Sequence, residues 1–197
     1  AYSSDLVGAS SYFWAVKHNQ FHHTYVNING YDDDISLGVL GRLSHEQPRL
    51  SFHRFQHLYM WFLYTFLNVK WNFYDDYNAL IRAKIGEQPI ERPRGYDLLA
   101  FILGKAFFYT WALIIPMTIH SFWSVVAVYY AVSAIAGITL AIVFQLAHLI
   151  EEASFPSPDP STNRISEEWT IHQIQTTVNF SPKNALVTWY VGGLNFQ

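Results

Sequence analysis

The sequence predicts an all-α fold, a polytopic helical membrane protein whose cytoplasmic helices carry a histidine-rich metal site. Charged residues make up only 14% of the 197 residues, against about 25% in an ordinary soluble domain. Two long stretches carry almost no charge, which predicts membrane helices. Three histidines within six residues near the N-terminus predict the metal site.

The two membrane helices are predicted from length and composition. Residues 98–117 form a stretch of 20 residues with one charge, Lys105, and residues 121–147 form a stretch of 27 with none. About 20 residues at 1.5 Å each cross roughly 30 Å of hydrocarbon. Because only three residues, 118–120, join the stretches, residues 98–148 are predicted to form a transmembrane hairpin.

The hairpin returns the chain to the side it left, so the segments before and after it share one face of the membrane. Residues 70–97 contain several basic residues and the turn of the hairpin contains none, so this face is predicted to be cytoplasmic. The basic residues are Lys70, Arg82, Lys84, Arg92 and Arg94. The apolar residues 58–69, "LYMWFLYTFLNV", are too few for a span, and we expect a helix at the membrane interface.

Charge and cysteine content exclude some classes of protein and site. A net charge of -3 and a pI near 6.3 provide no basic field, so nucleic acid is not an expected partner. With no cysteine there is no disulfide and no thiolate-ligated metal. Any metal must therefore be held by histidine, carboxylate or carboxamide side chains.

The cluster "KHNQFHH" is the main candidate metal site. On a helix, His18 and His22 lie four residues apart and share a face, as two imidazoles on one ion require. His23 points about 100° away, so it either completes the same site from a bend or reaches a second ion. Imidazole suits zinc, iron, copper and nickel, so the spacing leaves the metal open.

Two further histidines are candidates for the same site. His148 ends the second span in "FQLAHLIEE", where an ionisable residue is a functional candidate. His172, in the predicted helix near residues 166–180, has either a site role or an ordinary polar contact.

Other polar residues are not expected to belong to the metal site. We expect headgroup or structural contacts for His45, His53 and His57, a remote position for His120, a solvated turn for Asp32, Asp33 and Asp34, and snorkelling or pairing for Lys105.

Four segments in order resemble the membrane fatty acid desaturases, in particular the front-end and linoleoyl-CoA desaturase-like branch. They are "KHNQFHHTYVNINGYDDDI", "RFQHLYMWFLY", "FQLAHLIEEASFP" and "EWTIHQIQTTVNF…GGLNFQ". The resemblance implies a cytoplasmic di-iron centre held by three histidine boxes. His18, His22 and His23 match the second box, His148 matches an extra ligand at the end of the fourth membrane helix, and Gln197 stands where a QxxHH box begins.

The resemblance also implies an activity, an oxidoreductase that uses two iron ions and O2 to place a cis double bond in a fatty acyl chain. The implied partners are a fatty acyl-CoA or acyl-lipid substrate, a cytochrome b5-like or ferredoxin-type electron donor, and a lipid membrane, either endoplasmic reticulum or bacterial inner membrane. No catalytic residue beyond the metal ligands is expected. His172 and Gln197 are candidates for an additional ligand or for a residue that supports one.

The chain is expected to be one membrane desaturase domain over residues 1–197, in which residues 149–197 lead into the third box. By the resemblance, the first box and the paired histidines of the third lie outside the chain, which alone would be incomplete and inactive. Two alternatives stay open. A di-iron membrane hydroxylase of alkanes or lipids would give an alcohol, and a receptor-like lipid hydrolase would use zinc and need no reductant.

Overall fold

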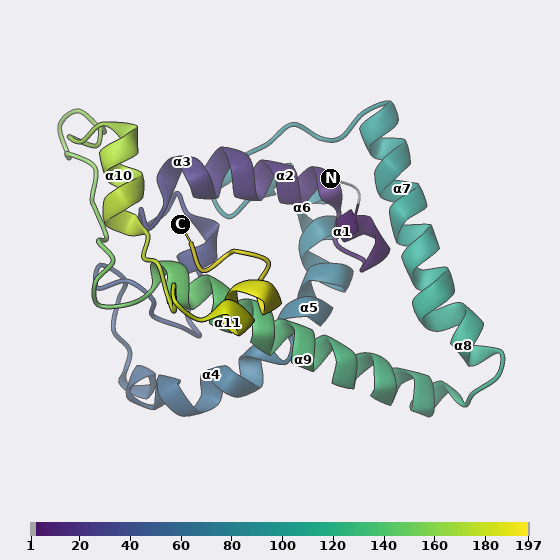
Figure 1. Cartoon of the computed structure of the whole chain (residues 1–197). Helices are drawn as coiled ribbons and strands as arrows, with labels where there is room; N and C mark the ends of the chain where they lie inside the picture. The colour runs from purple at the N-terminus through teal and green to yellow at the C-terminus, as the bar shows by residue number, and fades with distance from the viewer. Residues whose placement is uncertain (1–2, 197) are drawn as a thin grey trace. The chain divides into compact units, whose positions relative to one another are not determined.

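The structure, a computed structural model, describes residues 3–196 and is mostly helical, with almost no sheet (Figure 1). It consists of two compact units, residues 1–19 with 61–138 and residues 20–60 with 139–197. The chain passes between them within the π-helix Val16–His22, within α4 (Gln56–Tyr64) and within α9 (Phe122–His148). The prediction of one domain over residues 1–197 stays a prediction.

The first unit contains the two long apolar helices up to the middle of α9. Its other elements are α1 (Ser3–Leu6), α2 (Ser11–Ala15), α5 (Leu67–Lys70), a π-helix (Trp71–Asp75), α6 (Asp76–Arg82), a small antiparallel pair β1 (Lys84–Ile85) and β2 (Gln88–Pro89), and α7 (Tyr96–Tyr109), which continues through a π-helix (Thr110–Ile114) into α8 (Ile115–Met117).

The second unit contains short helices and long connections around the C-terminal part of α9. Its elements are α3 (His23–Tyr25), 3-10 helices at Asp33–Ile35 and Ser51–Phe55, α4 up to Met60, α10 (Trp169–Thr176) and α11 (Ala185–Tyr190). Buried Val26, Ile28, Ile35 and Ala147 form much of its apolar core. α10 confirms the helix expected near residues 166–180.

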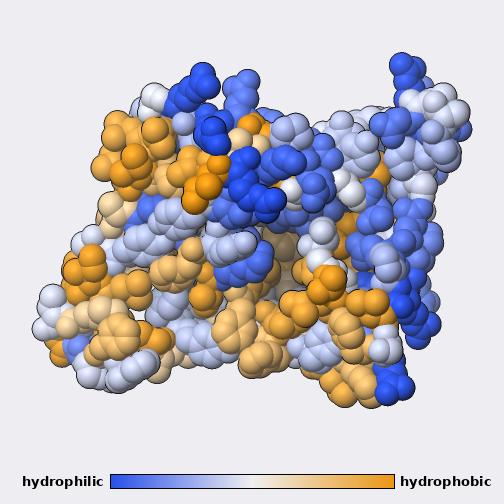
Figure 2. Space-filling model, turned by 180° about the vertical axis from the view of Figure 1, so that it is seen from behind, coloured by the Kyte–Doolittle hydropathy of each residue, from blue (hydrophilic) through white to orange (hydrophobic). Residues whose placement is uncertain are grey.

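Two helices in the described part of the chain are long and apolar enough to cross a membrane, Tyr96–Met117 and Phe122–His148. They confirm the predicted spans to within two residues at each end. Most of their side chains are at least partly exposed, among them Leu103 at 58% and Ile135 at 69%. Figure 2 shows broad orange patches of such hydrophobic side chains on the surface. Exposing so much apolar surface to water would cost free energy, so a lipid bilayer is the suitable environment for these helices.

The segment predicted to lie at the interface, residues 58–69, is not one helix. α4 ends at Tyr64 and α5 begins at Leu67, and the break lets the chain approach α9 closely. Gly137 of α9 lies against the carbonyl oxygen of Tyr64, where a Cβ atom would clash with the backbone. The Nδ2 of Asn68 donates to the Oγ of Ser133, 3.2 Å away, and ties the two segments together. Interfacial placement of this segment stays a prediction.

Lys105, the one charge of the first span, is buried in the first unit rather than snorkelling to water. Its Nζ donates to the carbonyl oxygens of Gly8 (2.6 Å) and Asn72 (3.0 Å) and to Asp76 Oδ2 (2.7 Å). Asp76 also accepts a hydrogen bond from the backbone N–H of Ser10 at 2.8 Å. Burial raises the pKa of the Asp76 carboxyl, and Lys105 opposes this shift. Of the two expected roles for Lys105, pairing is confirmed.

Candidate metal centre

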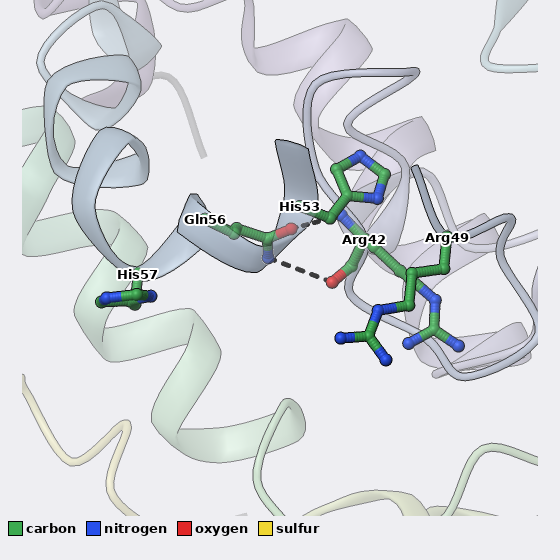
Figure 3. A pocket seen from close by; sticks show the side chains of 5 residues that line it. All are labelled: Arg42, Arg49, His53, Gln56 and His57. Carbon is green, nitrogen blue, oxygen red and sulfur yellow. Dashed lines mark hydrogen bonds between the residues drawn. The ribbon is translucent and has the colours of Figure 1, made fainter. Parts of the chain in front are cut away.

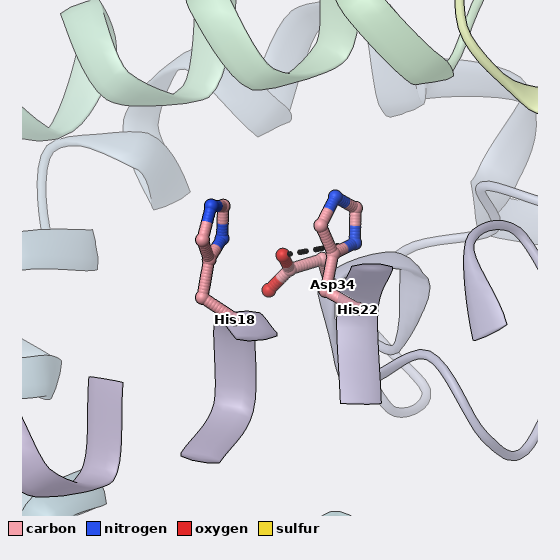
Figure 4. Close-up of side chains that lie close together, drawn as sticks. All are labelled: His18, His22 and Asp34. Atoms are coloured by element: carbon pink, nitrogen blue, oxygen red, sulfur yellow. Dashed lines mark ion pairs between the residues drawn. The ribbon is translucent and has the colours of Figure 1, made fainter. Parts of the chain in front are cut away.

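The cluster of three histidines begins on a π-helix, Val16–His22. Single π-helical turns within α-helices occur often at functional sites. Figure 4 shows His18 and His22 projecting from the same side of this helix, with the carboxylate of Asp34 beside them. One ligand atom from each of the three residues lies within 4.8 Å of the others, so this group could hold a metal ion.

The orientation of the His22 ring is fixed by a buried carboxylate. Asp32 is 1% exposed, and His22 Nδ1 lies 3.1 and 3.2 Å from its two oxygens. The same carboxylate accepts hydrogen bonds from the backbone N–H groups of Asn27 (2.9 Å) and Asp34 (3.0 Å). Because a carboxylate only accepts, Nδ1 of His22 carries the proton, and a neutral ring then has its lone pair on Nε2.

The His148 ring is oriented in the same way by a backbone carbonyl. It is the last residue of α9, is buried, and its Nδ1 lies 3.3 Å from the carbonyl oxygen of Thr176. Its Nδ1 therefore donates, and its Nε2 is again the atom with the lone pair. The Nε2 atoms of His22 and His148 face each other at 3.3 Å. Two lone pairs cannot hydrogen-bond to each other, so this arrangement is suited to bind a metal cation between the two rings.

These residues fit a metal ion. Metal to imidazole nitrogen distances of about 2.0 to 2.1 Å place two nitrogens on one ion roughly 3.0 to 3.4 Å apart, and the observed 3.3 Å lies within that range. A carboxylate hydrogen-bonded to the far nitrogen of a histidine, as Asp32 is to His22, is the usual support of a metal-bound histidine.

Asn27 joins the segments that carry these residues. It adopts a left-handed conformation with φ of 59°, which asparagine tolerates better than most residues. Its Nδ2 donates to the carbonyl oxygens of His148 (2.8 Å) and Ser154 (3.1 Å). It therefore connects the end of α9 and the loop that follows to the chain just after α3.

The other candidate residues have different positions. His172 on α10 is 4% exposed; burial lowers its pKa, and its Nε2 has no hydrogen-bond partner in residues 3–196. His23 is exposed and outside the His18, His22 and Asp34 group, and its pKa is lowered first by partial burial and then by His22. His120 is exposed in the turn before α9. Gln197 lies outside the described residues.

The expectation of a solvated aspartate turn is wrong for Asp32. The apolar residues Ile28 and Ile35 on either side are both buried, and they bring the turn between them inward. Asn27 and Asp32 were not identified from the sequence as site residues. The available signal was the short segment of three aspartates bounded by apolar residues so soon after the histidines.

Comparison with known proteins identifies one family that this chain resembles over most of its length. The model of the fatty acid desaturase family matches residues 5–197. The sn-1 linoleoyl-lipid 6-desaturase of Arthrospira platensis is 39% identical over 98% of this chain and 52% of its own length. The protein of the same name from Synechocystis is 35% identical over 98% and 54%, and an acyl-lipid (8-3)-desaturase of Physcomitrium patens is 34% identical over 99% and 41%.

The chain therefore spans about half the length of the curated relatives it matches. No solved structure matches it.

Proposed function

The chain belongs to the fatty acid desaturase family, and from that premise we propose that the intact protein carrying it is a membrane fatty acyl desaturase with a di-iron centre. His18, His22, His23 and His148 are the proposed iron ligands, with His172 as a further ligand or a support for one. The names of the relatives favour an acyl-lipid over an acyl-CoA substrate.

The observation that carries this proposal is the facing pair of Nε2 atoms of His22 and His148, 3.3 Å apart. Each Nδ1 atom donates to an oxygen, that of His22 to the Asp32 carboxylate and that of His148 to the Thr176 carbonyl. The two rings are thus held as neutral imidazoles with their lone pairs directed at one point, as ligands of a cation need. His22 is also part of the group with His18 and Asp34, so it is the residue common to both candidate arrangements.

The role of the chain's own residues is to hold ligands in place. Asp32 fixes the tautomer and tilt of His22 and adds a negative charge behind the ring, which makes Nε2 a stronger donor to a cation. The Thr176 carbonyl does the same for His148 without a full charge. Asn27 holds the backbone of His148 through its carbonyl oxygen, so the ring is fixed at both ends.

When bound, iron would supply the oxidising power that no side chain has. The overall reaction would consume O2, two protons and two electrons from a cytochrome b5-like or ferredoxin-type donor. Two adjacent methylenes would lose one hydrogen each, and the products would be a cis double bond and two waters. Because the same set of residues would suit a hydroxylase, product identity decides between the two.

The hairpin and the positive-inside pattern support a cytoplasmic position for this centre, in the endoplasmic reticulum or a bacterial inner membrane. We further propose that residues 1–197 act as one membrane domain, with α10 and α11 in the cytoplasmic segment after the hairpin.

The experiment that tests the function measures iron per chain and fatty acid products of the intact protein, purified from iron-supplied membranes. Wild type should hold about two irons and form an unsaturated acyl product. His22→Ala and His148→Ala should each lose iron and product, whereas the control His120→Ala should keep both. Full iron and activity in His22→Ala would overturn the ligand assignment, and an alcohol product would replace the desaturase with the hydroxylase.

A further inference from the structure

A second cluster of polar side chains lies in the second unit, separate in sequence from the metal ligands. The cluster lines a pocket of about 400 Å³ and consists of Arg42, Arg49, His53, Gln56 and His57. Figure 3 shows the guanidinium groups of Arg42 and Arg49 on one side of this pocket and the His57 ring on the other. All five lining residues carry polar side chains, which is unusual in a chain that is 51% hydrophobic.

The pocket carries positive charge that the chain does not neutralise. Among residues 3–196, no carboxylate forms an ion pair with Arg42 or Arg49. Arg42 donates through Nε to the carbonyl oxygen of Gln47 at 2.8 Å and through Nη2 to the carbonyl oxygen of His45 at 2.5 Å, and these bonds orient the group without cancelling its charge. Residues 37–60 contain three arginines and one glutamate, so this segment is basic within a chain of net charge -3.

The pocket is held in shape by hydrogen bonds that leave its cations available. Gln56 accepts from the backbone N–H of Arg42 at 2.7 Å and donates to the Arg42 carbonyl at 3.0 Å. His53 uses both ring nitrogens, accepting from the Leu50 N–H and donating to the Val39 carbonyl. These two residues are therefore structural, whereas Arg49 and His57 can direct donors into the pocket.

Apolar side chains flank the pocket along the same short stretch of chain. Phe52, Phe55 and Leu58 are 40%, 48% and 63% exposed, and they alternate along the helical turns with His53, Gln56 and His57. A ligand that satisfies both features has a compact anion with apolar chains attached to it. Arginine binds phosphate through two parallel hydrogen bonds, and aromatic side chains insert well at the level of lipid headgroups.

We propose that Arg42, Arg49 and His57 form a binding site for the phosphate group of an anionic membrane lipid, with Phe52, Phe55 and Leu58 against its acyl chains. This site does not depend on iron or on the desaturase assignment. A soluble phosphate-bearing molecule, such as coenzyme A, offers the same anion without attached lipid chains, so the test must separate the two sources.

The test is isothermal titration of the intact protein in a neutral detergent. The probes are dioctanoyl phosphatidic acid, dioctanoylglycerol, which lacks the phosphate, and inorganic phosphate and coenzyme A, which lack the lipid chains. We expect saturable binding of phosphatidic acid alone. Tight binding of dioctanoylglycerol would show that the phosphate is not recognised, and coenzyme A binding as tightly as phosphatidic acid would assign the site to a soluble ligand; either result overturns the proposal.

Substitutions locate the binding. Arg49→Gln removes a cation without removing a hydrogen bond that supports the pocket wall, and it should weaken phosphatidic acid binding by roughly ten- to hundredfold, the usual loss for a charge-assisted contact. Arg54→Gln is the matched control, because Arg54 is an exposed arginine of the same segment that does not line the pocket. Equal weakening by both substitutions, or no effect of Arg49→Gln in a protein that unfolds at the wild-type temperature, would overturn the site.

Discussion

Two buried polar clusters among the described residues, one in each unit, differ in how their ionisable groups are paired. In the first unit, all three N–H groups of Lys105 have oxygen acceptors, one of them the carboxylate of Asp76. In the second, His22 and His148 present facing lone pairs, and Nε2 of His172 has no partner among the described residues. A cluster whose charges are matched internally stabilises a fold, whereas one whose imidazole lone pairs converge on a point is suited to bind a cation.

The largest expected effect is the loss of Lys105. Lys105→Met leaves the Asp76 carboxylate buried without its cation, and removing one partner of a buried ion pair costs about 3 to 5 kcal/mol in the free energy of unfolding. Chemical unfolding in detergent measures it. The control Lys70→Met breaks an exposed pair with Asp75, worth about 0 to 1 kcal/mol.

Further replacing Asp76 with Leu in the Lys105→Met protein should recover part of the loss, because the buried charge is then gone. If Lys105→Met costs no more than Lys70→Met, Lys105 is not held by a buried pair.

Asp32→Asn is expected to weaken iron binding rather than to unfold the protein. The carboxamide keeps the shape of the side chain but removes the negative charge behind His22, and loss of such a support usually costs about 10- to 100-fold in metal affinity. Competition with a graded iron chelator measures the affinity. Asp33→Asn, the control, removes a charge from the same turn and leaves Asp32 in place. An unchanged iron affinity in Asp32→Asn would contradict the supporting role.

Asn27→Gly should have a smaller effect on stability. Glycine accepts the left-handed conformation at φ of 59°, so the substitution removes the side-chain hydrogen bonds without backbone strain. Loss of the two shorter bonds, to His148 and Ser154, should lower the free energy of unfolding by about 1 to 3 kcal/mol, at 0.5 to 1.5 kcal/mol each.

Asn163→Gly is the matched control, since Asn163 is also left-handed, at φ of 53°, but is exposed. A similar loss in both variants would mean that Asn27 contributes through its conformation only.

The contrast between the clusters also explains what could be predicted from the sequence. The two spans follow from composition and length alone, so residues 98–117 and 121–147 were predicted almost to the residue. The spacing of His18 and His22 is local as well, and it survives even though the helix is π-helical there.

The features that the sequence alone did not predict depend on contacts between residues far apart in the chain. Asp32 is buried beside His22 because Ile28 and Ile35 pack inward, and the partner of Lys105 lies 29 residues away in sequence. The proximity of His22 to His148, 126 residues apart, could be inferred only from the resemblance to a family and not from any periodicity. Local patterns thus predicted which residues could bind a metal, and tertiary structure determines which of them meet.

The smallest expected effect concerns Tyr109, a neutral member of the Lys105 cluster. Its hydroxyl lies 3.0 Å from the Asn72 carbonyl oxygen, to which it donates, and 2.9 Å from the Tyr77 hydroxyl. Tyr109→Phe leaves Lys105 to satisfy the same carbonyl, so the loss should be about 0.5 to 1.5 kcal/mol in the free energy of unfolding, with iron content unchanged. Tyr74→Phe, at a side chain that is 58% exposed, is the control and should be nearly neutral. A loss of iron in Tyr109→Phe would show that the two clusters are coupled, because a purely structural network should affect stability without changing the metal held by each folded molecule.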